Sequence, residues 1–213
     1  MNRLIGISGL AGDGKDSVCN ILKKYFEKNT DFKFYQIALA DELKQDCRKA
    51  CLDMFGIDPV NCSREEKNKI RDFLVFYAKV MRSKTGGSHW ATQAEKKIKN
   101  IEPGNNIICI SDIRYGQYQK DEVQWLKSKK QATLIHVKKY KIIPVDNSSG
   151  GIELVKSYST PINQEEGIHC PAVEKMADII LEWPDVYPEK PEQNKNCVNV
   201  VNHIAKDLCA SYH

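Results

Sequence analysis

The chain has 213 residues, of which 41% are apolar and 28% charged, and its formal net charge is +4. This length suits one α/β domain with a substantial core and is short for two. The small net charge does not indicate a nucleic-acid-binding protein, which usually concentrates basic residues on one face. No apolar run reaches the ~20 residues of a membrane helix, and the N-terminal run meets glycines too early for a signal peptide. We therefore expect a soluble protein of the cytoplasm, or of the host cytoplasm if the protein is viral.

Short apolar runs and amphipathic segments alternate along the first hundred residues. Apolar runs at residues 3–8 and 34–39 predict two buried strands. Apolar residues three and four positions apart predict helices. Four such segments occur, around residues 18–25, 43–54, 70–81 and 88–99. Ser63, with Glu66 three positions later, has the pattern of a capping box for the third of these helices.

The second half of the sequence continues the alternation as far as about residue 137. The strands predicted there cover residues 106–110, 132–137 and 177–182, and the helices surround residues 123–126 and cover residues 197–209. Residues 138–171 show no clear period, and a long irregular segment inside a compact domain is more often a functional lid than a simple connection. Strands that alternate with helices predict an α/β fold with a mainly parallel sheet covered on both faces.

A glycine-rich turn follows the first predicted strand. Gly9 is separated by four residues from Gly14-Lys15, which fits the first part of the pattern G-x-x-x-x-G-K-[ST]. In such a loop, backbone N–H groups surround the β- and γ-phosphate oxygens of a nucleotide, and the next helix adds its positive N-terminal end. The lysine adds a full positive charge. The residues assigned to the triphosphate of ATP are Gly9, Gly12, Asp13, Gly14, Lys15, Asp16 and Ser17.

Asp16 stands where this pattern usually has a Ser or Thr that helps to hold Mg²⁺, and Ser17 follows it. Two arrangements fit this order of residues. In one, the carboxylate of Asp16 contacts the metal or one of its waters. In the other, Asp16 caps the helix and the hydroxyl of Ser17 contacts the metal.

A second element of phosphate chemistry is the apolar run at residues 107–110, which leads into Ser111-Asp112-Ile113-Arg114. An apolar strand that ends in an acid has the form of a Walker B segment, and its acid is expected at the carboxyl edge of the sheet, beside the phosphate loop. Asp112 is predicted to assist Mg²⁺ or to orient the acceptor. Arg114 is predicted to bind a phosphate with its planar guanidinium group.

With these two elements placed, the chain resembles the phage-type deoxynucleoside monophosphate kinases, a branch of the P-loop kinases. The segments that carry the resemblance are Ile7-Ser8-Gly9, Gly14-Lys15-Asp16-Ser17, residues 38–44, Ser111-Asp112-Ile113-Arg114, residues 132–137 and residues 177–180. The family also has Gly-Lys-Asp before a hydroxyl residue, so Asp16 fits its pattern. The resemblance implies a three-layer P-loop kinase fold that uses ATP and Mg²⁺ to phosphorylate a deoxynucleoside monophosphate.

The resemblance divides the single expected domain, residues 1–213, into functional parts. About 40–100 is the acceptor-binding helical region, about 138–171 is the lid, and 197–209 is the C-terminal helix. Within the lid, Lys138 and Lys139 are expected to close over the triphosphate, although family members often have arginine there.

Roles in phosphoryl transfer follow from these placements. The residues expected to act in catalysis are Lys15, Asp41, Asp112 and Arg114. The residues expected to bind the acceptor are Asp41, Lys44, Arg71, Arg82, Trp90 and Arg114. The residues expected to contact Mg²⁺ are Asp16, Ser17 and Asp112. For Arg71 and Arg82, a surface salt bridge is the competing interpretation.

Two other functions compete with this one. The first is a P-loop kinase that phosphorylates hydroxymethylated bases within DNA, for which the basic residues near 129–141 give modest support. The second is a nucleotide-binding module without catalytic activity. Under the favoured interpretation, the partners are small nucleotide substrates, with no membrane and no stable nucleic-acid complex, and the chain is a possible homodimer.

Overall fold

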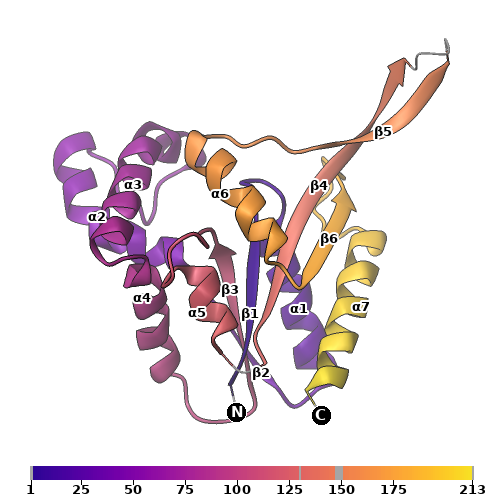
Figure 1. Cartoon of the computed structure of the whole chain (residues 1–213), viewed down its shortest axis with the longest axis horizontal. Helices are drawn as coiled ribbons and strands as arrows, with labels where there is room; N and C mark the ends of the chain where they lie inside the picture. Colours follow the sequence, from indigo (N-terminus) through magenta and orange to yellow (C-terminus); the bar gives the residue numbers. More distant parts are fainter. Residues whose placement is uncertain (1, 130, 147–150, 213) are drawn as a thin grey trace.

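The computed structural model describes residues 2–129, 131–146 and 151–212, and these residues form an α/β fold (Figure 1). The strands are β1 (Asn2–Gly9), β2 (Lys33–Ile37), β3 (Asn106–Ile113), β4 (Thr133–Asp146), β5 (Ile152–Tyr158) and β6 (Ile179–Pro184). The helices are α1 (Lys15–Asn29), α2 (Leu39–Phe55), α3 (Arg64–Lys84), α4 (Ser88–Lys99), α5 (Glu122–Lys127), α6 (Gln164–Lys175) and α7 (Lys195–Ser211).

Strand β1 lies in the middle of the sheet. It pairs in parallel with β3 on one side and with β4 on the other, so that Ile5 lies opposite both Cys109 and Thr133. Strand β2 extends the sheet in parallel beyond β3, and β6 pairs in parallel with β4. The chain thus moves from β1 outward to β2 and later crosses to the other side of β1. Ligands of open α/β sheets bind where the strand order reverses in this way, at the carboxyl ends of the strands.

The sheet is mixed, whereas the sequence predicted a mainly parallel one. The difference comes from β5, which runs antiparallel to β4 from Tyr140 opposite Tyr158 to Asp146 opposite Ile152. Strand β4 continues past the edge of the parallel strands and returns as β5. Figure 1 shows this β4–β5 hairpin projecting from the body of the molecule.

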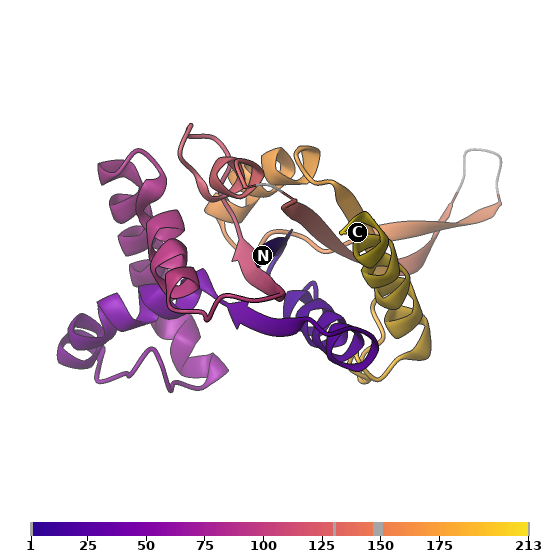
Figure 2. The ribbon, with the colours of Figure 1, turned by 90° about the horizontal axis from the view of Figure 1, so that it is seen from below.

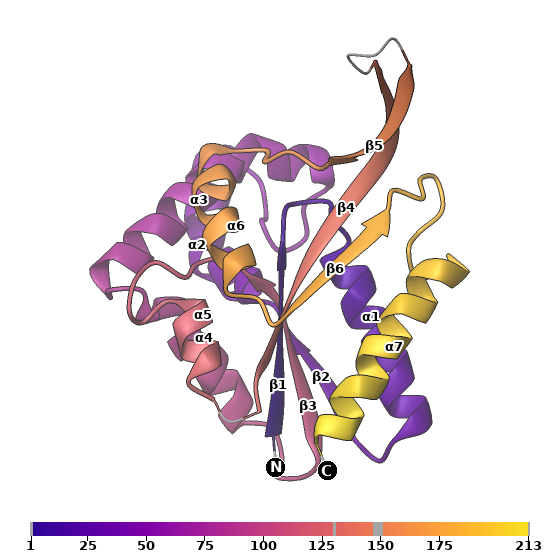
Figure 3. The same ribbon diagram turned by 45° about the vertical axis from the view of Figure 1, so that its right-hand side comes forward.

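Helices cover both faces of the sheet because side chains alternate between the faces along each strand. Ile5 and Ile7 of β1 point to the face covered by α1 and α7. Leu4 points to the other face, where it belongs to a cluster with residues of α4, α5 and α6. Figure 3 shows α1 and α7 on one side of the sheet and α4, α5 and α6 on the other.

Helices α2 and α3 form a small core of their own, in which Cys47 and Cys51 pack against Ile70 and Leu74. Figure 2 shows α2, α3 and α4 grouped at the end of the molecule opposite to the hairpin. The predicted capping box is present at the start of α3. The hydroxyl of Ser63 accepts the N–H of Glu66 at 3.2 Å, and the Ser63 N–H donates to the Glu66 carboxylate at 2.8 Å.

The prediction of an irregular segment at residues 138–171 is wrong for most of its length. Within its described part, residues 138–146 complete β4, residues 152–158 form β5, and α6 begins at Gln164. Residues 147–150 lie outside the described residues. None of the helices in the described ranges is long and apolar enough to cross a membrane.

Candidate functional site

The loop predicted to bind phosphate, residues 9–15, joins β1 to α1 and contains three glycines with left-handed backbone angles. We call it the phosphate loop. The φ angles are 137° at Gly9, 90° at Gly12 and 92° at Gly14. Residues other than glycine rarely adopt such positive φ angles. A Cβ atom on Gly14 would lie 2.5 Å from the Trp183 ring, whereas one on Gly12 would meet nothing within 4 Å. The loop is therefore packed against β6 at Gly14 and open at Gly12.

Lys15 is the first residue of α1, and its ammonium group turns back over the loop. It donates to the carbonyl oxygens of Gly9 at 2.9 Å and Leu10 at 2.8 Å. Burial lowers the pKa of Lys15, and the nearby positive charge of Arg114 lowers it further. The loop itself is fixed at Asp13, whose carboxylate accepts the Leu10 N–H at 3.1 Å and whose carbonyl accepts the Trp183 indole N–H at 2.9 Å.

Asp16 and Ser17 occupy the first turn of α1, where Asp16 is exposed and Ser17 is half-buried. Within the described ranges, no group of three or more His, Cys, Asp or Glu residues could hold a metal ion. Mg²⁺ in nucleotide sites is held by one or two protein oxygens together with phosphate oxygens and water. The carboxylate of Asp16 and the hydroxyl of Ser17 fit that requirement only together with a bound triphosphate.

Asp112 lies near the end of β3, and its side chain is buried. Its two oxygens accept the N–H groups of Leu39 and Ala40, each at 2.7 Å, at the start of α2. Burial raises the pKa of Asp112, while these backbone hydrogen bonds and the positive charges of Arg114 and Lys15 lower it. Asp112 is therefore hydrogen-bonded to the start of α2, and its charge also interacts with that of Lys15 in the phosphate loop.

Arg114 follows β3 and lines two neighbouring cavities. Its guanidinium Nη1 donates to the Glu166 carboxylate of α6 at 3.2 Å, and its backbone N–H donates to the Glu122 carboxylate at 2.6 Å. Glu122 also accepts the N–H of Tyr115 at 3.1 Å. These bonds fix the turn after β3, so the position of the guanidinium group is set by both α5 and α6.

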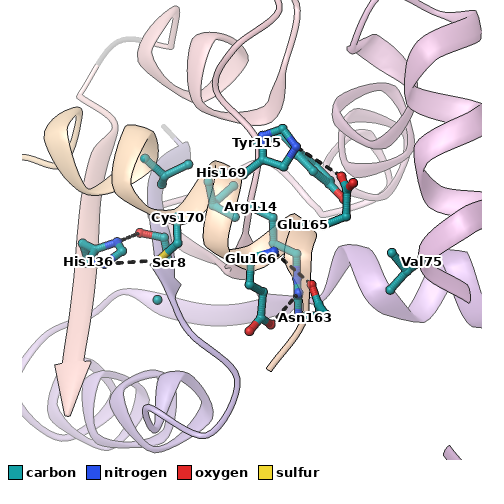
Figure 4. Close-up of a pocket in the computed structure, with 13 residues that line it drawn as sticks. Ser8, Val75, Arg114, Tyr115, His136, Asn163, Glu165, Glu166, His169 and Cys170 are labelled. Atoms are coloured by element: carbon teal, nitrogen blue, oxygen red, sulfur yellow. Dashed lines mark hydrogen bonds and ion pairs between the residues drawn. The ribbon is translucent and has the colours of Figure 1, made fainter. Parts of the chain in front are cut away.

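The first cavity lies between the phosphate loop and α6 (Figure 4). Arg114, Tyr115 and His169 lie on one side of it in this view, and His136 lies on the other side with Ser8 and Cys170. The Ser8 hydroxyl is 2.8 Å from Nδ1 of His136. Burial lowers the pKa of His136 to about 4, so this imidazole is neutral near pH 7.

The second cavity lies between α2, α3 and the end of β3. Polar and apolar residues both line it: Leu39, Ala40, Leu43, Lys44, Lys67, Arg71, Leu74, Val75, Ala78, Trp90, Asp112, Arg114, Tyr115, Glu122 and Asn163. We call this cavity the α2–α3 pocket. Five residues predicted from the sequence for acceptor binding or catalysis line it together: Lys44, Arg71, Trp90, Asp112 and Arg114. Asp41 lies beside the pocket, where its exposed carboxylate pairs with Lys44 at 3.0 Å.

Arg82 does not line the α2–α3 pocket, which corrects its predicted role in binding the acceptor. Its guanidinium group is buried in an ion pair with Asp121. The partner precedes α5 and is 39 residues away in the sequence, so no local pattern around Arg82 indicates the pair.

Several residues of the pocket wall were not predicted from the sequence, above all Lys67, Glu122 and Asn163. Lys67 precedes Arg71 by four residues, so both lie on one face of α3. That spacing is the signal by which Lys67 could have been found. Glu122 and Asn163 come from segments that the sequence did not relate to the acceptor.

The two lysines predicted for the lid have different surroundings. Lys138 donates to the Glu174 carboxylate at 2.7 Å and lies 4.4 Å from the centroid of the Tyr158 ring. Lys139 is 3.6 Å from the Asp185 carboxylate and lines an open groove together with the phosphate loop and residues 185–192. Only Lys139 therefore adjoins the predicted triphosphate site.

No protein-family model matches this sequence, and a comparison with curated proteins gives no match either. The residues of the phosphate loop and of the two cavities are therefore the features from which a function can be inferred.

Proposed function

We propose that this chain has a three-layer P-loop kinase fold and transfers the γ-phosphoryl group of ATP to a deoxynucleoside monophosphate. The observation that carries the proposal is the position of Arg114. It lines the α2–α3 pocket and also lies close enough to Lys15 of the phosphate loop for its charge to lower the pKa of that lysine. Donor and acceptor phosphates would thus meet at Arg114.

Transfer to a phosphate acceptor needs little covalent chemistry from the protein. An acceptor phosphate oxygen forms a bond to the γ-phosphorus while the bond from that phosphorus to the β-phosphate oxygen breaks, and ADP leaves. The protein aligns the two substrates and stabilises the negative charge. In this proposal Lys15 leaves the carbonyls of Gly9 and Leu10 and contacts the β- and γ-phosphates. Arg114 neutralises charge between donor and acceptor.

The remaining residues have roles either in the triphosphate site or in the acceptor pocket, which meet at Arg114. The backbone N–H groups of the loop and the N-terminal end of α1 hold the triphosphate. Asp112 keeps the start of α2 next to the phosphates, and Lys44 and Arg71 hold the acceptor, with Trp90 in the apolar wall of its pocket. Bound together with ATP, Mg²⁺ would neutralise charge on the β- and γ-phosphates. Asp16, Ser17 and Asp112 are the oxygen ligands that the chain offers it.

The test is the formation of ADP from ATP and Mg²⁺ with each nucleoside and deoxynucleoside monophosphate supplied in turn. We expect one or a few monophosphates to stimulate ADP formation and to be converted to diphosphates. Lys15→Ala is the control and should abolish the stimulation. A rate that stays at background with every monophosphate would contradict the proposal. DNA with hydroxymethylated bases would then be the next acceptor to test, followed by nucleotide binding without catalysis.

A further inference from the structure

Basic side chains outnumber acidic ones in the wall of the α2–α3 pocket. The cations are Lys44 from α2, Lys67 and Arg71 from α3, and Arg114 from the turn after β3. The carboxyl groups that line the same pocket are Asp112 and Glu122, and each of these accepts two backbone N–H groups. These acids are thus held by the backbone and form no ion pair with the α3 cations.

Lys67 and Arg71 are the cations of this wall for which the described ranges show no ion pair. Lys44 pairs with Asp41, and Arg114 pairs with Glu166. Within the described ranges, the ammonium group of Lys67 has no ion pair, and Arg71 donates only to the amide oxygen of its neighbour Asn68. A partly buried ammonium without an anion nearby is unfavourable, because burial removes water that is not replaced.

The surroundings of Lys67 increase this cost. Burial lowers its pKa, and the positive charges of Lys44, Arg71 and Arg114 lower it further. Like charges held near one another at a partly buried site destabilise the protein unless an anion neutralises them. Such an arrangement is typical of a site that binds an anion.

The spacing of residues along α3 places Lys67 and Arg71 on the same side of the helix, so that both can contact one ligand. Lys67, Arg71, Leu74, Val75 and Ala78 all line the pocket, and their spacing of 4, 3, 1 and 3 places them on one face of the helix. The two cations occupy the N-terminal part of this face and the apolar residues the C-terminal part. The pocket therefore offers charge at one end and an apolar wall at the other.

We propose that Lys67, together with Arg71, binds the phosphate group of an organic phosphomonoester whose apolar part lies along the α3 wall toward Ala78 and Trp90. This inference rests on the proposed function and deepens it, because it makes the phosphate of the acceptor its main recognition element. A nucleoside without a phosphate is then a poor ligand. Lys67 acts as a binding residue that positions the acceptor.

The experiment measures binding without ATP, by calorimetric titration of the whole chain with each of the common deoxynucleoside monophosphates, the corresponding deoxynucleosides and inorganic phosphate. Lys67→Met is compared with Lys67→Arg, which keeps the charge, and with Lys69→Met, which removes an exposed lysine from the same helix. We expect Lys67→Met to weaken monophosphate binding about 10- to 100-fold, the size of a lost charge-assisted hydrogen bond. Lys67→Arg should retain most of the affinity, and Lys69→Met all of it.

A second measurement guards against a purely structural effect of the substitution. In buffer without phosphate, Lys67→Met should unfold at the same temperature as the unaltered chain or at a higher one, because repulsion among the cations is relieved. It should also lose most of the stabilisation that inorganic phosphate gives. Lower stability without phosphate and unchanged stabilisation by phosphate would overturn the inference.

The outcomes separate this inference from the kinase proposal. Equal monophosphate affinity in the Lys67→Met and Lys69→Met variants overturns the inference, as does equal affinity for nucleoside and monophosphate. If the kinase reaction is then observed with an unchanged KM for the acceptor in Lys67→Met, the proposed function stands without Lys67. If Lys67 proves necessary for binding but no monophosphate is phosphorylated, the anion site stands and the kinase proposal fails.

Discussion

The guanidinium group of Arg82 and the carboxylate of Asp121 form a buried two-point ion pair, in which Nε donates to Oδ1 and Nη2 donates to Oδ2, both at 2.7 Å. The rings of Tyr115 and Tyr118 lie against the same guanidinium group, with centroids 4.3 Å and 4.2 Å from its central carbon. The pair joins the last turn of α3 to the residue that precedes α5. It therefore holds one wall of the α2–α3 pocket in place, although neither Arg82 nor Asp121 lines the pocket.

Replacing Arg82 with methionine should reduce the free energy of unfolding by about 3–5 kcal/mol, because it leaves the Asp121 carboxylate buried without its partner. Urea denaturation measures this change. The matched control is Arg71→Met on the same helix, which should change the free energy of unfolding by less than about 0.5 kcal/mol. Equal stability of the two variants would restore Arg82 as a candidate for ligand binding.

The phosphate loop offers a second matched pair of substitutions, Gly12→Ala and Gly14→Ala. Both residues have a left-handed backbone, so each alanine should cost about 1–2 kcal/mol of stability. Only the alanine at position 14 also meets the Trp183 ring, and overpacking of this kind adds about 1–3 kcal/mol. Thermal or urea unfolding should therefore rank Gly14→Ala as clearly less stable than Gly12→Ala. The reverse order would show that the loop does not pack against β6 as described.

The sequence predicted the elements that have a buried face, because burial imposes a period on the apolar residues. Helix α3 packs one face on a core, and strand β1 is packed on both of its faces. The β4–β5 hairpin was missed for the same physical reason. It is largely exposed on both faces, so no alternation marks it, and Pro144 argues against a strand. Helix α6 was missed because Gly167 and Pro171 interrupt its pattern.

The sequence also placed most of the residues around the candidate site, but it could not supply contacts between distant segments. The phosphate loop was predicted because its glycines and Lys15 follow one another in a fixed order. The engagement of Arg82 by Asp121, and of Arg114 by Glu166, depends on how α5 and α6 pack. The partners in such pairs are far apart in the sequence, so only the folded structure reveals them. These ion pairs decide which arginine is available for a ligand.

Glu122 should make stability depend on pH. Burial raises the pKa of this carboxyl from its ordinary value of 4.5 to about 8. Between these two values, the folded chain holds a proton that the unfolded chain has released, so the free energy of unfolding falls as pH rises from about 4.5 to about 8. The slope from this group is at most about 1.4 kcal/mol per pH unit. Above pH 8 its contribution is constant.

Comparison with Glu122→Gln isolates this contribution. Glutamine keeps an oxygen that can accept the N–H groups of Arg114 and Tyr115, but it does not titrate. Urea denaturation at a series of pH values should show the Gln variant gaining stability relative to the unaltered chain as pH rises from 5 to 8. If the difference in the free energy of unfolding between the two chains stays constant across this range, burial does not raise the pKa of Glu122 above its ordinary value.

Lys139 provides the last test, because it separates a triphosphate contact from general positive charge on the hairpin. Lys139 and Lys141 both lie 3.6 Å from Asp185, but only Lys139 lines the groove with the phosphate loop. If the proposed function is correct, Lys139→Met should raise the KM for ATP about 10-fold, as expected for the loss of one charge near a phosphate. Lys141→Met should leave this KM within about 2-fold, since its side chain is mostly in water and is screened by salt. The same KM in both variants would mean that the hairpin lysines do not bind the donor, and the predicted lid would then have to act without them.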